Sequence, residues 1–196
     1  MIITEQKPFE EVVESLSGCS RVAVLGCGRC ATTCATGGER EVAQMADDLS
    51  AKGFKVIYTG VVEAQCDMRL SRKALNQAPE FDAVVAMSCG SGAQALSELT
   101  DKPVIPSNNT LYLGVVRRIG DYSQRCIQCG DCTIHETEGV CVKTRCSKGL
   151  LNGPCGGVSD GKCEVDGSKE CAWTEVIRRL RAKGELKNLG EIRRTK

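Results

Sequence analysis

The feature that most constrains this chain is a crowded run of cysteines toward its C-terminus. Eight of the 14 cysteines fall in a segment that is rich in glycine and charge and poor in large apolar residues. So few apolar side chains cannot form a stable hydrophobic core alone. In small domains of this kind, bound metal commonly supplies the missing folding free energy. We therefore expect metal to stabilise this segment. Its candidate ligands are Cys126, Cys129, Cys132, Cys141, Cys146, Cys155, Cys163 and Cys171.

The spacing of the first three cysteines favours iron–sulfur over zinc. Cys126, Cys129 and Cys132 form a Cys-x2-Cys-x2-Cys run, which brings three thiolates around one small volume, as a 4Fe–4S cubane requires. Zinc sites more often pair two Cys-x2-Cys knuckles, and this segment has no second one. Eight thiols suffice for two cubanes, or for one cubane and one zinc ion, and their order leaves the pairing open. His135 is a less favoured ligand, because the cysteines already suffice.

Composition excludes several functional classes. The 26 basic and 25 acidic residues nearly balance, so we expect no nucleic-acid partner and no binding to a membrane surface. No apolar run is long enough to span a bilayer, and the first residues lack a signal-peptide pattern. We expect a cytoplasmic protein, whose reduced thiols indicate metal binding rather than disulfides. A single histidine gives no basis for a Ser/His/Asp or Cys/His catalytic set.

Residues 1–120 alternate between apolar strands and amphipathic helices. Strands are predicted at 21–25, 54–58, 81–87 and 103–105, with helices at 8–16, between Gly38 and Gly53, at 70–78 and at 93–99. This alternation indicates right-handed βαβ units and a parallel sheet. We predict an α/β fold: a small doubly wound, Rossmann- or flavodoxin-like domain with strand order 2-1-3-4. Residues 121–196 would form the cysteine-rich domain, with a helix at 172–183 and a solvated basic tail from 186.

Five further cysteines follow the carboxyl ends of the predicted strands, where doubly wound sheets bind ligands. A four-thiolate cluster there would leave at least one of them as a spectator. The sequence does not say which one, and the tight loop favours Cys30 and Cys34 as ligands. The same loop matches a relaxed dinucleotide fingerprint, Gly26-x-Gly28-x-x-Ala31, which we consider much weaker because cysteines crowd it and no acid ends the next strand. The five candidates are Cys27, Cys30, Cys34, Cys66 and Cys89.

Two motifs carry a resemblance to a known family. Asn152-Gly-Pro-Cys-Gly-Gly157, with Gly161-Lys-Cys-Glu164 and Cys171-Ala-Trp173, resembles the C-terminal cysteine-rich domain of methylenetetrahydrofolate reductases. Gly26-Cys-Gly-Arg-Cys30, with Cys34 and Gly37-Gly-Glu, resembles the small iron–sulfur subunit that accompanies this reductase in acetogenic bacteria. Val142 after Cys141 departs from ferredoxin-like runs, which often have proline there.

The resemblance implies an electron-transfer subunit with two or more 4Fe–4S clusters. It would relay electrons from ferredoxin, or another redox subunit, to FMN held by the partner catalytic subunit and not by this chain. That partner would reduce 5,10-methylenetetrahydrofolate to 5-methyltetrahydrofolate in the methyl branch of the reductive acetyl-CoA (Wood–Ljungdahl) pathway. The alternative is a zinc-binding structural or assembly module of the same reductase, and a weaker rival is an NAD-linked oxidoreductase.

Overall fold

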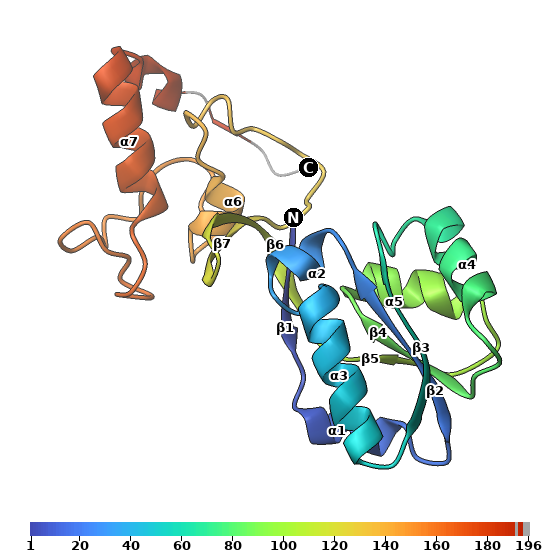
Figure 1. Ribbon diagram of the computed structural model, residues 1–196. Coiled ribbons are helices and arrows are strands. Elements are labelled where there is room, and N and C mark those ends of the chain that lie inside the picture. Colours follow the sequence, from blue (N-terminus) through green and yellow to red (C-terminus); the bar gives the residue numbers. More distant parts are fainter. Residues whose placement is uncertain (191, 194–196) are drawn as a thin grey trace. The chain divides into compact units, whose positions relative to one another are not determined.

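The computed structural model describes residues 1–190, 192 and 193, and the chain divides into two compact units (Figure 1). The first comprises Met1–Tyr112 and Val116–Tyr122, and we call it the α/β unit. The second comprises Leu113–Val115 and Ser123–Lys196, and we call it the cysteine-rich unit.

A four-stranded parallel sheet is the centre of the α/β unit (Figure 1). Its strands are β2 (Arg21–Cys27), β3 (Lys55–Val62), β4 (Ala83–Met87) and β5 (Val104–Pro106), in the order β3-β2-β4-β5. The central strands β2 and β4 consist largely of valine, alanine and leucine, because both of their faces are buried. The α/β class, the parallel sheet and its predicted strand order are confirmed.

Helices cover both faces of this sheet. Val22 and Val24 of β2 share a core with α1 (Phe9–Ser15) and α3 (Glu39–Ala51). The alternate residues Ala23 and Leu25 share the opposite core with α4 (Met68–Gln77) and α5 (Gly90–Ser97). Side chains alternate between the faces of a strand, so one apolar run supplies both cores. A one-turn helix, α2 (Cys30–Thr33), comes between β2 and α3.

A second, three-stranded sheet was not predicted. It consists of β1 (Ile2–Gln6), β6 (Asn108–Arg118) and β7 (Asp121–Cys126), in the order β1-β6-β7. Ile119 and Gly120 connect β6 to β7, and Gly120 has the positive φ of 85° that tight hairpin turns require. Most residues of β6 and β7 are exposed or half-buried, so the apolar alternation that identifies a strand is weak there.

The cysteine-rich unit contains the short helix α6 (Val142–Arg145), the helix α7 (Ala172–Lys183) and a 3-10 helix, η1 (Leu186–Gly190). Helix α7 is the predicted C-terminal helix. Its buried residues Trp173, Val176 and Leu180 pack with Val140 and Val142, and Trp173 Nε1 donates to the Leu150 carbonyl at 3.0 Å. This unit therefore has a small apolar core besides its cysteines.

The prediction of a solvated tail from residue 186 is wrong for its first residues. Leu186–Gly190 form η1, and Leu189 packs against the core built on α7. Because most of the segment is polar or charged, its sequence did not indicate that Leu189 packs against this core. The rest of the predicted tail lies partly outside the described residues, at 191 and 194–196.

Asp82 connects the starts of β2 and β4. Its Oδ2 accepts the backbone N–H groups of Ser20 (3.1 Å) and Arg21 (2.8 Å), and its Oδ1 accepts Arg21 Nη2 at 2.9 Å. The side-chain hydrogen bond from Arg21, followed by that from the Arg21 backbone, lowers the pKa of Asp82 to about 2. An unfolded aspartate has a pKa of about 3.9. The ionised carboxylate therefore stabilises the fold above that pH, and this contribution is lost as the pH falls toward 2.

Replacing Asp82 should consequently destabilise the α/β unit in a pH-dependent way. We expect Asp82→Asn to lower the melting temperature by a few degrees at neutral pH, and the difference from wild type to shrink as the pH approaches 2. Circular dichroism melts of the metal-free chain measure this. Glu80→Gln is the matched control, because Glu80 is 78% exposed and should give a smaller change. An Asp82→Asn penalty that is independent of pH would contradict this account.

Candidate metal centres

Four of the predicted cysteine ligands follow the carboxyl ends of β2, β3 and β4. Cys27 is the last residue of β2, and Cys30 opens α2. Cys66 lies in the loop between β3 and α4, and Cys89 is the residue before α5. Cys27 and Cys89 are buried, Cys30 is half-buried and Cys66 is exposed. We call this set the sheet-edge cysteines: Cys27, Cys30, Cys66 and Cys89.

The sheet-edge cysteines are electrostatic neighbours. Burial raises the pKa of the Cys66 thiol, and the negative charges of Cys89, Cys27 and Cys30 raise it further. The strands β3, β2 and β4 are adjacent and parallel, so the three connections that carry these thiols leave the same edge of the sheet. A bound metal group would relieve the repulsion between the thiolates, because coordination to a cation stabilises their deprotonated form.

The fifth candidate, Cys34, has a different environment. It caps the C-terminal end of α2 and is buried, with its Sγ 3.8 Å from the carbonyl oxygen of Ile2, to which it donates. Cys30 Sγ, in contrast, accepts the backbone N–H of Ile2 at 3.4 Å. The sequence favoured Cys30 and Cys34 together, and the structure places both sulfurs against the backbone of Ile2 in β1.

Gln65 holds the Cys66 loop in place, and the sequence analysis did not identify it. Its side chain is fully buried, and its Nε2 donates to the carbonyl oxygens of Leu25 (3.0 Å) and Gly26 (3.2 Å) at the end of β2. Ser71 Oγ donates to the Gln65 carbonyl at 2.7 Å. A glutamine in a loop carries no sequence signal of burial, so only the fold reveals this role.

A lysine lies beside the first thiols of the cysteine-rich unit. Lys143 Nζ donates to Oδ2 (2.5 Å) and to the carbonyl oxygen (3.1 Å) of Asp131. The pKa of Lys143 is raised chiefly by its hydrogen bond to the Asp131 carboxylate, and the charges of Asp131, Cys129 and Cys141 raise it further. The loop before α6 and the start of α6 therefore share one neighbourhood. Cys126 and Cys132 belong to the same Cys-x2-Cys-x2-Cys run as Cys129. We call these four cysteines the first thiol group: Cys126, Cys129, Cys132 and Cys141.

A second lysine–carboxylate pair lies beside the remaining thiols. Lys148 pairs with Glu164, and the pKa of Lys148 is raised first by that hydrogen bond and then by the charges of Cys155, Glu164 and Cys163. The backbone N–H of Cys171 donates to the carbonyl oxygen of Gly161 at 2.8 Å, which brings the start of α7 close to Cys163. Cys146 directly precedes Ser147, whose hydroxyl forms a hydrogen bond with Cys163. We call these four cysteines the second thiol group: Cys146, Cys155, Cys163 and Cys171.

Several sulfurs in these groups accept backbone N–H groups from the residue two positions later. Gln128 N donates to Cys126 Sγ at 3.2 Å, and Gly157 N donates to Cys155 Sγ at 3.4 Å. The pKa of Cys163 is lowered by a hydrogen bond from the Ser147 hydroxyl and by the backbone N–H groups of Val165 and Asp166. Such bonds favour the thiolate, and hydrogen bonds to cluster sulfurs are one of the means by which proteins tune reduction potential. The donor set therefore fits a thiolate-bound metal or cluster.

The structure itself does not form a closed metal site. Within residues 1–190, 192 and 193, no group of three or more histidine, cysteine, aspartate or glutamate side chains is arranged to hold a metal ion. All 14 cysteines, each within those residues, are free thiols. His135 is exposed, with its Nε2 3.5 Å from the Glu136 carboxylate. The metal ligands therefore stay predictions.

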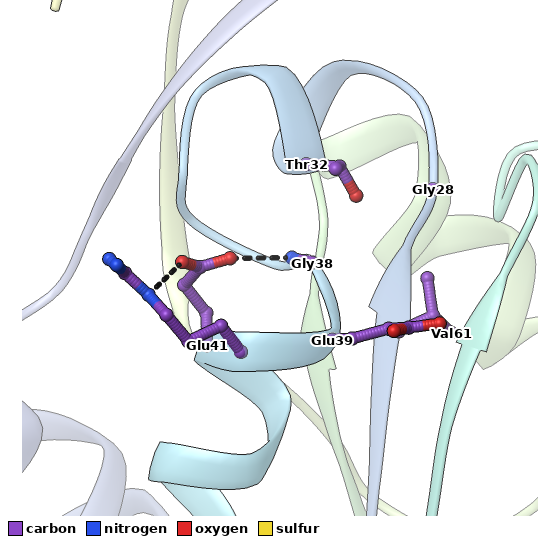
Figure 2. A pocket seen from close by; sticks show the side chains of 7 residues that line it. Gly28, Thr32, Gly38, Glu39, Glu41 and Val61 are labelled. Atoms are coloured by element: carbon purple, nitrogen blue, oxygen red, sulfur yellow. Dashed lines mark hydrogen bonds and ion pairs between the residues drawn. The ribbon is translucent and has the colours of Figure 1, made fainter. Parts of the chain in front are cut away.

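The glycine-rich loop after β2 is explained by packing rather than by nucleotide binding. A Cβ on Gly26 would lie 2.3 Å from the Gly37 carbonyl oxygen, so the close contact between these backbones requires glycine. The hollow beside this loop is lined by Gly28, Thr32, Gly38, Glu39, Arg40, Glu41 and Val61 (Figure 2). At the start of α3, the Glu41 carboxylate accepts the Gly38 N–H at 3.0 Å and also binds Arg40 Nε at 3.2 Å (Figure 2). A carboxylate of the chain itself therefore occupies the N-terminus of α3, the first helix of more than one turn after this loop.

Comparison with known families relates part of the chain to a reductase. Residues 105–196 match the family model described as methylene-tetrahydrofolate reductase C terminal, so the cysteine-rich segment is related to that domain. No curated protein and no solved structure matches the chain. Among the described residues, no helix has the length and apolar character to cross a membrane.

Proposed function

We propose that this chain is the iron–sulfur electron-transfer subunit of a methylenetetrahydrofolate reductase. The observation that carries the proposal is the concentration of eight cysteines in the segment that matches the reductase family. A chain with thiols grouped in this way and only one, exposed histidine is better suited to carrying electrons than to acid–base chemistry.

The residues around each group have distinct roles in this proposal. The cysteines would hold 4Fe–4S clusters, which when bound supply one-electron transfer. The backbone N–H groups of Gln128 and Gly157, which donate to the sulfurs of Cys126 and Cys155, would stabilise the more negative, reduced state. Lys143 and Lys148, each held by a carboxylate, would add positive charge beside the sulfurs. Hydrogen bonding and local charge are the protein's means of raising a cluster's potential.

The partners follow from this role. Ferredoxin, or another redox subunit, would donate single electrons, and the chain would pass them to FMN in the catalytic subunit. That subunit would bind the folate and reduce 5,10-methylenetetrahydrofolate to 5-methyltetrahydrofolate in the methyl branch of the reductive acetyl-CoA pathway. We place the chain in the cytoplasm, where its thiols stay reduced.

The test is electron transfer to the partner flavin. Anaerobically purified full-length chain is reduced chemically, freed of reductant, and mixed with the oxidised FMN subunit in a stopped-flow spectrometer. We expect the flavin absorbance to bleach as the brown chromophore of this chain reoxidises. The matched control, Cys126→Ser/Cys129→Ser, should bleach the flavin far less. A colourless chain with stoichiometric zinc and no acid-labile sulfide would instead favour the zinc-binding assembly module.

A further inference from the structure

We infer that Arg193 joins two loops of the cysteine-rich unit, and that Asn152 is the residue that positions it. The first loop, residues 133–140, directly follows the Cys-x2-Cys-x2-Cys run. The second loop, residues 147–157, directly follows Cys146 of the second thiol group. The inference rests on the proposed function only for the clusters that the cysteines beside these loops would hold.

Asn152 binds the main chain of Arg193 at two points. Its Nδ2 donates to the Arg193 carbonyl oxygen at 3.0 Å, and its Oδ1 accepts the Arg193 N–H at 2.7 Å. Both halves of the side-chain amide therefore have a partner 41 positions away in the chain. Because Asn152 contacts only main-chain atoms, this interaction does not depend on which side chain residue 193 carries.

The side chain of Arg193 binds the other loop. Its guanidinium forms an ion pair with the Glu136 carboxylate, and the Arg193 side chain is only 19% exposed. Water and salt screen a partly buried ion pair less than a fully exposed one. One residue therefore holds both loops, the second through its main chain and the first through its side chain. We call the contacts of Arg193 with Asn152 and Glu136 the Arg193 bridge.

Helix α7 contacts the same two loops. Trp173 Nε1 donates to the carbonyl oxygen of Leu150, in the second loop, at 3.0 Å. Arg179 Nη1 donates to the carbonyl oxygen of Glu138, in the first loop, at 2.8 Å, and Lys183 pairs with the Glu138 carboxylate. The Arg193 bridge therefore adds a second connection between loops that the helix already connects.

The Arg193 bridge limits the separate opening of the two loops. Both loops consist mainly of turns and irregular backbone, and segments of this kind open locally at a low free-energy cost. A residue that binds both loops at once keeps the thiols beside them at a constant spacing. A relay of electrons needs its cofactors held in fixed positions, which is what this connection would supply.

Hydrogen exchange in the anaerobic full-length chain tests the Arg193 bridge. The reporters are the amides of Gly139 and Val140 in the first loop and of Gly149 in the second, each hydrogen-bonded to a main-chain carbonyl oxygen. Asn152→Ala removes both hydrogen bonds to Arg193 and releases its main chain. We expect exchange at the reporters of both loops to become roughly tenfold faster.

Arg193→Ala separates the two halves of the bridge. Asn152 can still bind the main chain of residue 193, so the second-loop reporter should exchange at the wild-type rate. The first-loop reporters should exchange roughly two- to fivefold faster, because only the ion pair is lost. Asn76→Ala, which changes an exposed asparagine on α4, is the matched control and should alter neither loop. Far-UV circular dichroism identifies a variant that fails to fold, and Arg193→Ala tests the bridge without changing Asn152.

Three results would overturn the inference: faster exchange confined to the second loop in Asn152→Ala, wild-type exchange of the first loop in Arg193→Ala, or faster exchange of the second loop in Arg193→Ala. Failure of the proposed function has a different signature. If electrons never reach the flavin but the exchange pattern holds, the Arg193 bridge stands and the relay is wrong. If electrons reach the flavin but neither variant changes the exchange rates, the bridge is wrong and the relay stands.

Discussion

Cys126→Ser/Cys129→Ser should abolish donor-driven turnover of the reconstituted reductase while dye-driven turnover persists. A reduced viologen is a small molecule that can reach the partner flavin directly, so it needs no cluster in this chain. A protein donor cannot approach a buried flavin closely, and its electrons must pass through the clusters. We therefore expect the donor-driven rate to fall to a few per cent of wild type or less, with the dye-driven rate near its original value.

The assay compares both rates in the same reconstituted complex. Cys19→Ser is the matched control, since Cys19 is the one cysteine that is not among the candidate ligands. Gel filtration confirms that each variant still binds the catalytic subunit. If cluster-free variants keep full donor-driven turnover, the chain is a scaffold and the relay is wrong.

Removing metal should unfold the cysteine-rich unit and leave most of the α/β unit folded. Among the described residues, the apolar core of the cysteine-rich unit has six buried members, whereas the two faces of the parallel sheet have ten and seven. Structural metal contributes about 10–16 kcal/mol in zinc-finger peptides, which is as large as the whole stability of a typical domain, about 5–15 kcal/mol. Loss of the metal should therefore remove more stabilising free energy than the small apolar core contributes.

Limited trypsin digestion after chelation measures this difference. We expect the first cuts between Arg125 and Lys169, where Lys143, Arg145 and Lys148 become accessible. The fragment that retains the parallel sheet should persist longest, because the cores on its two faces do not depend on metal. Undigested holo-protein is the control. Early cutting within residues 20–110 would show that the sheet, and not the cysteine-rich unit, depends on metal.

The sequence by itself determined the parallel sheet and the helix α7. Four apolar runs separated by helical patterns specify βαβ units, and the handedness of such connections leaves few strand orders. Because strands deliver their carboxyl ends to one edge, the sequence also predicted that five cysteines could meet there, namely Cys27, Cys30, Cys34, Cys66 and Cys89. In α7, the helical spacing of Trp173, Val176 and Leu180 was sufficient to predict the helix, because a single face of it is buried.

Only the tertiary structure decided the details that distinguish one thiol from another. Cys30 and Cys34 are equivalent in the sequence, and they differ because β1 presents an N–H to one and a carbonyl to the other. The sheet containing β1, β6 and β7 was also beyond prediction, since its exposed strands lack apolar alternation and its order depends on pairing between distant segments. Hydrogen bonds between residues far apart in the chain leave no periodic trace in the sequence, and the burial of Gln65 is the clearest example.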